Sequence, residues 1–169
     1  MNKMQEIKIE KLTLNIGAGK DQGKLEKGLK LIKHLTGLNA IKCKTTKRIP
    51  TWGLRPGLPV GCKITIRNKV KIELIKSFLK AKANKLKLNN FDSNGSIAFG
   101  ITEYIDIPDV KYSPEVGLMG LQISITLERP GFRIKRRRIQ KKTLPKKHRI
   151  SKENAIEFMK KEFNLELEE

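Results

Sequence analysis

The residues that could carry out chemistry are few and are scattered along the chain. His34 and His148 each lack a serine, cysteine or carboxylate pair at a spacing that would support acid–base or nucleophilic catalysis. Cys43 and Cys62 form no CxxC pair, and two cysteines with two histidines do not supply the four clustered ligands of a zinc site. We therefore expect no enzyme activity, no cofactor and no metal, and we expect both cysteines to be buried thiols in an intracellular protein.

The glycine-rich segment 15–20 (NIGAGK) is the only motif that suggests a nucleotide site. A Walker loop that begins at Gly17 would need its second glycine where Gln22 stands. A dinucleotide-binding fingerprint also fails, because its third glycine falls one place late, at Gly23. A turn that ends a strand explains the segment better.

The charge balance points to a polyanionic partner. Lys and Arg number 37 against 17 Asp and Glu, a formal net charge of +20, which would repel itself in a free compact chain. Nucleic acid is the natural counterpart. A membrane surface is the rival, but no apolar stretch is long enough to span a bilayer and the first residues do not resemble a signal peptide. We expect a cytoplasmic protein that does not bind membranes.

The charge is concentrated in residues 129–149, which contain eleven basic residues and no acidic residue. We call this stretch the basic segment. Its like charges and few apolar side chains predict that it becomes ordered only against phosphates. Residues 150–169, with six acidic and three basic residues, are mildly acidic. The pattern divides the chain into a domain at 1–128 and a C-terminal extension at 129–169.

Hydrophobic periodicity predicts an α+β fold. Alternation of apolar and polar residues indicates half-buried strands, and recurrence at helical spacing indicates amphipathic helices. Ser151 is suited to cap the last helix. We expect two layers: a mainly antiparallel sheet with helices on one face, a long protruding loop between strands two and three, and an extended basic segment that ends in a helix. The strands are expected at 12–16, 40–46, 62–67, 97–101 and 121–127, and the helices at 25–35, 70–83 and from 151 onward.

One face of the predicted sheet would remain open and would carry hydroxyls, amides and cations. Such side chains suit contacts to RNA phosphates and 2′-hydroxyls. An ordinary solvated sheet face fits the alternation equally well. The residues concerned are Thr13, Asn15, Lys63, Thr65, Arg67, Gln122, Ser124 and Thr126.

The loop at 48–61 combines three prolines and three glycines with the only tryptophan of the chain. Its apolar side chains have few rigid neighbours to bury them, which favours a protruding loop that docks onto a partner. Trp52 could stack on a base or sugar, and Arg55 could bind a phosphate. In the alternative interpretation, the loop folds back and Trp52 packs on the domain.

Several strings of residues resemble the universal large-subunit ribosomal protein L-five family. These are LNIGAGK, GCKITIR, NFDSNGSIAFGITEYIDIP and VKYSPEVGLMGLQISITLERPGFR, in order along nearly the whole chain. KKHRISKENAIEFMKKEF resembles the C-terminal extension of the archaeal and eukaryotic branch. Leu38, Thr46 and Asn68 depart from the family pattern. An RNA-modifying enzyme and an architectural DNA-binding protein remain the competing hypotheses.

The resemblance implies a structural role at the central protuberance of the large subunit. Family members bind 5S rRNA, attach it to the large-subunit rRNA, contact P-site tRNA, bridge to the small-subunit head protein S-thirteen and touch neighbouring large-subunit proteins. The implied 5S rRNA-binding residues are Asn15 and Thr65, and around them we place Gly17, Gly19, Lys20, Lys47, Lys63 and Arg67. The implied tRNA loop comprises Trp52, Gly53, Leu54, Arg55, Pro56, Gly57, Leu58 and Pro59. The candidate rRNA contacts of the extension are Arg133, Arg136, Arg137, Arg138, Lys141, Lys142, Lys146, Lys147, His148 and Arg149.

Overall fold

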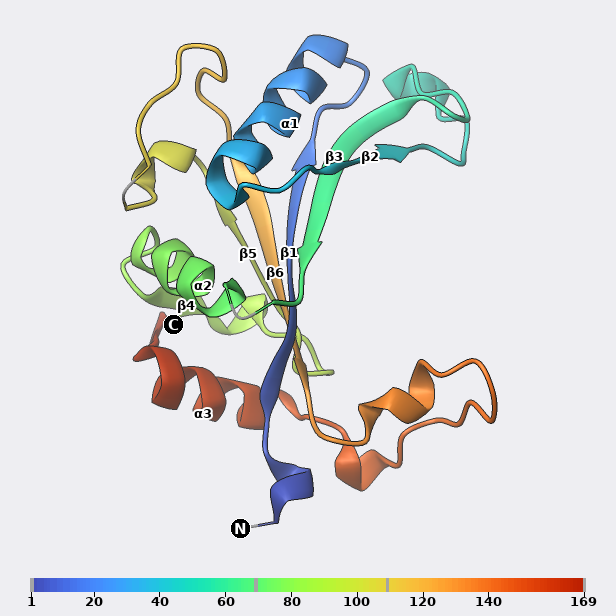
Figure 1. The fold of residues 1–169 in the computed structure, drawn as a ribbon, viewed down its shortest axis with the longest axis vertical. Helices are drawn as coiled ribbons and strands as arrows, with labels where there is room; N and C mark the ends of the chain where they lie inside the picture. Colours follow the sequence, from blue (N-terminus) through green and yellow to red (C-terminus); the bar gives the residue numbers. More distant parts are fainter. Residues whose placement is uncertain (1, 69, 109, 169) are drawn as a thin grey trace.

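A five-stranded antiparallel sheet is the main element of the computed structural model, which describes residues 2–68, 70–108 and 110–168 (Figure 1). The strand order is β2-β3-β1-β6-β5, so β1 lies at the centre. All strands expected from alternation are present, which confirms the α+β assignment. Their bounds are β1 Lys8–Gly17, β2 Ile41–Lys44, β3 Pro59–Ile66, β5 Ile97–Ile101 and β6 Leu121–Glu128.

Three helices accompany the sheet: α1 (Gln22–Thr36), α2 (Lys71–Lys80) and α3 (Lys152–Phe163). Two of them have clear capping residues, and the second is the predicted Ser151. Gly37 ends α1 with a left-handed backbone at φ 69°, and the Ser151 side chain accepts a hydrogen bond from the Asn154 backbone N–H at 3.3 Å to cap α3. None of the helices described is long and apolar enough to cross a membrane.

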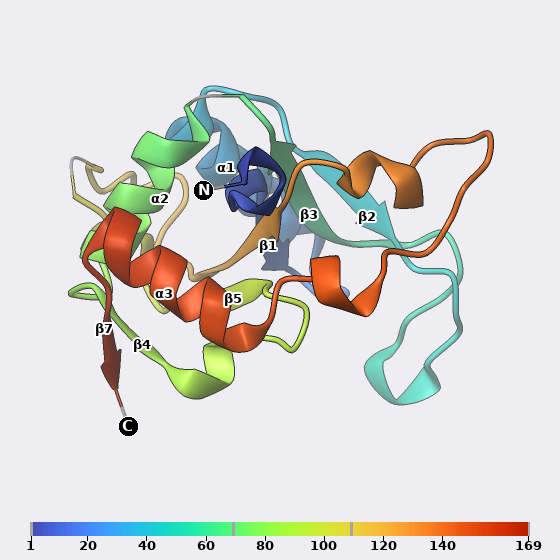
Figure 2. The same cartoon turned by 90° about the horizontal axis from the view of Figure 1, so that it is seen from below.

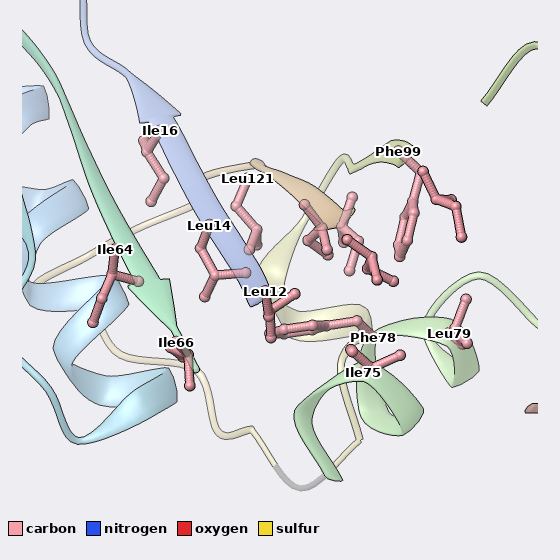
Figure 3. Close-up of a cluster of buried hydrophobic side chains, with 14 of the residues drawn as sticks. Leu12, Leu14, Ile16, Ile64, Ile66, Ile75, Phe78, Leu79, Phe99 and Leu121 are labelled. Atoms are coloured by element: carbon pink, nitrogen blue, oxygen red, sulfur yellow. The ribbon is translucent and has the colours of Figure 1, made fainter. Parts of the chain in front are cut away.

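The apolar core lies between the sheet and the helices (Figure 3). Leu12 and Leu14 of β1 and Phe78 of α2 are fully buried and belong to one hydrophobic cluster. Helix α1 approaches the sheet closely at Gly28, where an added Cβ would lie 3.1 Å from the Cys62 sulfur. Both helices therefore cover the apolar face, while α3 lies at one end of the sheet and contributes Ala155 and Met159 to the core (Figure 1).

A two-stranded parallel sheet was not expected from the sequence. Strand β4 (Lys85–Lys87) pairs with β7 (Glu166–Glu168), so the C-terminal residues lie beside a segment eighty residues earlier in the chain (Figure 2). Three-residue strands are too short for alternation to identify them. Short 3-10 turns occur at Lys3–Gln5, Pro50–Trp52, Leu88–Asn90, Tyr104–Asp106, Phe132–Lys135 and Lys146–His148.

Candidate nucleic-acid interface

The expected polar residues form rows across the open face of the sheet. Cross-strand neighbours on one face are held in register by the backbone ladder. Lys63 pairs with Asn15, and Asn15 pairs with Gln122 on its other side. Ile41 of β2 and Gly100 of β5 complete this first row across all five strands. The face is therefore one continuous surface and not five separate strand edges.

A second row lies beside the first. Thr65, Thr13, Ser124 and Ala98 pair in turn from β3 to β5. Lys11 pairs with Thr126 further along and adds a cation beyond the expected residues. Asn15, Lys63, Thr65, Arg67 and Gln122 are exposed, while Thr13, Ser124 and Thr126 are half-buried.

Ile41 is the unexpected member of the first row. Its side chain is 67% exposed, beside Lys63 on the open face. A strand at 40–46 was expected to include Ile41. Because β2 lies at the edge of the sheet, only β3 lies next to Ile41 in the sheet. An exposed β-branched residue in a polar row can contact a ribose or base through van der Waals packing.

The far end of the open face is flat backbone. Gly17 of β1 pairs with Gly61 of β3. An added Cβ at Gly17 would meet nothing within 4 Å, whereas at Gly61 it would lie 2.7 Å from the Ile16 carbonyl oxygen. Gly61 is therefore required by packing. Gly17 is not, and its bare backbone lets a partner approach closely.

The turn after β1 is tied to the start of β3. The backbone N–H groups of Ala18 and Gly19 both donate to the Val60 carbonyl oxygen, at 2.8 and 3.0 Å. Gly19 adopts a left-handed backbone at φ 62°, which explains a glycine there without a nucleotide. Lys20 follows in an exposed position, and its side chain passes close to Gly53, in the middle of the loop between β2 and β3.

The loop between β2 and β3 is partly folded and partly exposed. Trp52 is 68% exposed, so the alternative in which it packs on the domain is wrong. Leu54, which we grouped with the docking side chains, is only 8% exposed, and the backbone of Ile49 is hydrogen-bonded to that of Leu54 in both directions at 3.0 Å. The apolar residues thus have two roles: Leu54 stabilises the loop and Trp52 faces outward. Arg55, Pro56, Gly57 and Lys47 are also exposed.

The basic segment is attached to the domain by apolar residues at both ends. Phe132 and Leu144 are buried, and Ile150 directly after the segment is 1% exposed. Ile150 packs against Gly95, where an added Cβ would lie 2.6 Å from the Ile150 Cγ2 atom. We expected the segment to become ordered only against phosphates, and the structure adds apolar contacts to the core at its two ends. Between them, residues 135–143 are mostly exposed.

Arg136 and His148 have partners within the chain. The guanidinium of Arg136 forms ion pairs with Glu10 and with Glu128, the latter at 2.6 Å between Nη2 and Oε2. The His148 Nε2 atom lies 2.8 Å from the Pro130 carbonyl oxygen, and its ring packs edge-on against Phe132. Both residues were expected to contact rRNA, and both have partners within the chain that hold the segment in place. Their spacing in sequence could not reveal acceptors that the fold supplies.

The other selected cations of the extension remain available. Arg133, Arg138 and the four lysines are exposed. Arg137 is half-buried and donates from Nε to the Gln140 carbonyl oxygen at 2.9 Å, which tightens the tip of the segment around left-handed Gln140. Arg149 donates to the Leu144 carbonyl oxygen at 3.3 Å but stays exposed. The exposed lysines are Lys141, Lys142, Lys146 and Lys147.

The described residues contain no group of three histidine, cysteine or acidic side chains that could hold a metal ion. Cys62 is fully buried under α1, and burial raises the pKa of its thiol to about 11, with a smaller contribution from Cys43. The Cys62 thiol therefore stays protonated at neutral pH and serves packing.

Two family models together match almost the whole chain. The model described as ribosomal protein L5 matches residues 2–55, and the model of the C-terminus of the same ribosomal family matches residues 59–158. The chain belongs to the ribosomal protein L5 family. Archaeal relatives named large ribosomal subunit protein uL5 agree over nearly their full length.

The relative from Sulfurisphaera tokodaii is 41% identical over all of this chain and 96% of its own length. The relative from Nanoarchaeum equitans is 44% identical over 97% of both chains, and that from Methanosphaera stadtmanae is 40% identical over 99% of this chain and all of its own. Membership of the L5 family makes the chain a structural protein of the large ribosomal subunit, with rRNA and ribosomal proteins as partners. It confirms the resemblance and rules out the enzyme hypothesis.

Proposed function

We propose that the chain binds 5S rRNA through the rows of the open sheet face and the turn at 17–20. The basic segment attaches this complex to the large-subunit rRNA at the central protuberance. The loop at 51–60 contacts P-site tRNA, and the protein takes part in a bridge to the small-subunit head protein S-thirteen. The 5S rRNA assignment is carried by one observation: the first row places Lys63, Asn15 and Gln122 side by side on an exposed surface.

The chemistry of this row suits RNA. An amide donates and accepts hydrogen bonds, so Asn15 and Gln122 can each bind a 2′-hydroxyl or base edge, while Lys63 neutralises a phosphate. The hydroxyls of Thr13 and Thr65 in the second row add further donors and acceptors. The flat end at Gly17 leaves space for a ribose–phosphate backbone.

In this proposal the sheet face binds 5S rRNA and the loop contacts tRNA. Trp52 lies on a 3-10 turn whose backbone is restricted by Pro50 and closed by Gly53 at φ 66°. A preformed turn loses little entropy on docking. Arg55 is exposed three residues further on and can bind a phosphate. The tRNA contact and the bridge to S-thirteen rest on the family resemblance, and the exposure of Trp52 supports the first of them.

Competition binding tests the 5S rRNA assignment. Labelled 5S rRNA bound to the protein is challenged with unlabelled 5S rRNA, tRNA and random duplex DNA. We expect only 5S rRNA to compete strongly. If about 6–10 phosphates are contacted, affinity should fall by roughly 10³–10⁵ between about 50 and 200 mM salt. Equal competition by duplex DNA, or a flat salt response, would contradict the proposal.

A further inference from the structure

A second basic surface lies beside the β5 edge of the sheet, away from the loop and the basic segment. Residues 74–91 contain five lysines and no acidic residue. They cover most of α2, the turn after it, strand β4 and the 3-10 turn Leu88–Asn90. Lys80, Lys85 and Lys87 are exposed and Lys82 is half-buried. In both views β4 lies on the opposite side of the molecule from the loop and the tip of the basic segment (Figures 1 and 2).

The surface is hollowed into a groove of about 360 Å³ beside the edge strand β5. Lys82, Lys85 and Lys87 line the groove, together with Asn90 and Gly100. Lys85 and Lys87 are two residues apart on one strand, so they project to the same side about 6.6 Å apart along it. Evenly spaced cations along an open groove suit the repeating phosphates of a nucleic-acid backbone.

The acidic C-terminus lies beside these lysines. In the parallel pair, Lys85 is opposite Glu166 and Lys87 is opposite Glu168. Leu86 and Leu167 are the middle residues of the two strands and point inward. Leu86 is buried and Leu167 is half-buried. Nevertheless, among the described residues none of the five lysines lies within 4 Å of a carboxylate oxygen. The carboxylates therefore reduce the local positive potential without occupying the cations as ion pairs.

We propose that Lys82, Lys85 and Lys87 form a second RNA-backbone site, and that the β7 carboxylates act as its internal competitor. The site would bind phosphates of an RNA helix other than the strand on the sheet face. Glu166 and Glu168 compete only through their charge: in the part of the chain that the structure describes they form no ion pair with the lysines, but they lower the positive potential that the phosphates of a partner meet. The inference rests on the proposed RNA-binding function but concerns lysines of β4 and of the turn before it, which are not part of the rows on the sheet face.

The lysines are tested by replacing Lys82, Lys85 and Lys87 with Gln in the full chain. A matched control replaces Lys24, Lys27 and Lys33 with Gln on the exposed side of α1, which changes net charge equally. Binding to a short RNA duplex of arbitrary sequence is measured over a salt series. We expect the groove variant to lower the salt slope by about 2–3 and the control to change it little. Equal losses in the two variants would reveal only a net-charge effect and overturn the proposal.

The acidic competitor is tested with Glu166→Gln and Glu168→Gln together, with Glu153→Gln and Glu157→Gln on α3 as the control. The β7 variant should bind the duplex about 3- to 10-fold more tightly and the control should not. Unchanged affinity in the β7 variant would remove the competitor role.

Lysine acylation followed by mass spectrometry distinguishes this site from the sheet face. In a complex with 5S rRNA alone, Lys63 should be protected and Lys85 and Lys87 should react. Adding large-subunit rRNA should protect the β4 lysines as well. Lys85 and Lys87 that stay reactive in assembled subunits would overturn the second site even if 5S rRNA binding holds. Protection of Lys85 and Lys87 without any effect of the lysine variant on RNA affinity would point to an acidic protein neighbour and overturn it too.

Discussion

Arg136 and Glu10 form an ion pair across 126 residues of sequence. Glu10 lies where the register of β1 shifts between Ile9 and Lys11, and its side chain is only 7% exposed. Lys71 of α2 donates from Nζ to the Ile9 and Glu10 carbonyl oxygens at 2.5 and 3.0 Å. The irregular part of the central strand is thus held by one cation from the basic segment and one from α2.

Arg136→Gln should destabilise the protein because it leaves the Glu10 carboxylate buried without its partner. Loss of one member of a buried pair costs about 3–5 kcal/mol. Since the Arg136 side chain is 42% exposed, we expect about 1–3 kcal/mol. Urea unfolding measures this loss of stability, with Arg138→Gln as the exposed control. Equal midpoints for the two variants would mean that the pair contributes nothing.

Limited proteolysis of the free protein should cut the basic segment only within residues 137–143. Phe132 and Leu144 anchor the flanking residues, while the tip has few buried side chains. Mass spectrometry of the first fragments locates the cuts, and assembled subunits should be protected. Early cleavage throughout 129–149 would instead show that the whole segment is unfolded without RNA.

Gly17→Ala should weaken 5S rRNA binding without altering stability. A methyl group at Gly17 meets no protein atom within 4 Å, but it would keep an RNA backbone from the flat end of the sheet. We expect a loss comparable to that of Asn15→Ala, about 1–3 kcal/mol. Filter binding and thermal unfolding are measured on the same samples, with the exposed Asn39→Ala as control. Normal binding by both Gly17→Ala and Asn15→Ala would exclude this end of the sheet.

Trp52→Ala and Leu54→Ala should separate function from stability in the loop. Trp52 is exposed, so its loss should leave unfolding unchanged and reduce tRNA retention on ribosomes that carry the variant. Leu54 is buried, so its truncation should cost about 2–3 kcal/mol. Neither should lower 5S rRNA affinity by more than about 1 kcal/mol. Loss of 5S rRNA binding in Trp52→Ala with normal tRNA retention would make the loop an rRNA anchor.

Cys62 should resist alkylation in the folded protein, whereas half-buried Cys43 should react. The pKa of the Cys62 thiol is raised from 9.0 to about 11, so the folded state binds its proton more tightly than the unfolded state. The resulting stabilisation is complete below about pH 9 and is lost as pH rises toward about 11. The free energy of unfolding of the wild type should therefore fall over this pH range. The fall should be smaller in the Cys62→Ala variant. Equal alkylation rates at both cysteines would contradict this picture.

Local sequence was sufficient for the elements that bury many side chains. In β1 and β6, alternation identifies the apolar face because each buried position repeats every second residue. In α1 and α3, Gly37 and Ser151 mark an end and a start because the unsatisfied backbone groups at helix termini require such residues. The polar rows followed from the same alternation, since the register of an antiparallel sheet brings alternating positions of neighbouring strands onto one face.

Only the tertiary structure decided which of the similar residues are free to bind a partner. Arg136 and Arg138 are equivalent in sequence, but the fold brings Glu10 and Glu128 to the first. Trp52 and Leu54 are both apolar loop residues, but a hairpin of the loop buries only Leu54. The pairing of β4 with β7 joins segments eighty residues apart. The Arg136 ion pairs, the burial of Leu54 and the β4–β7 pairing all depend on contacts made in the folded chain. Local composition and periodicity do not encode such contacts.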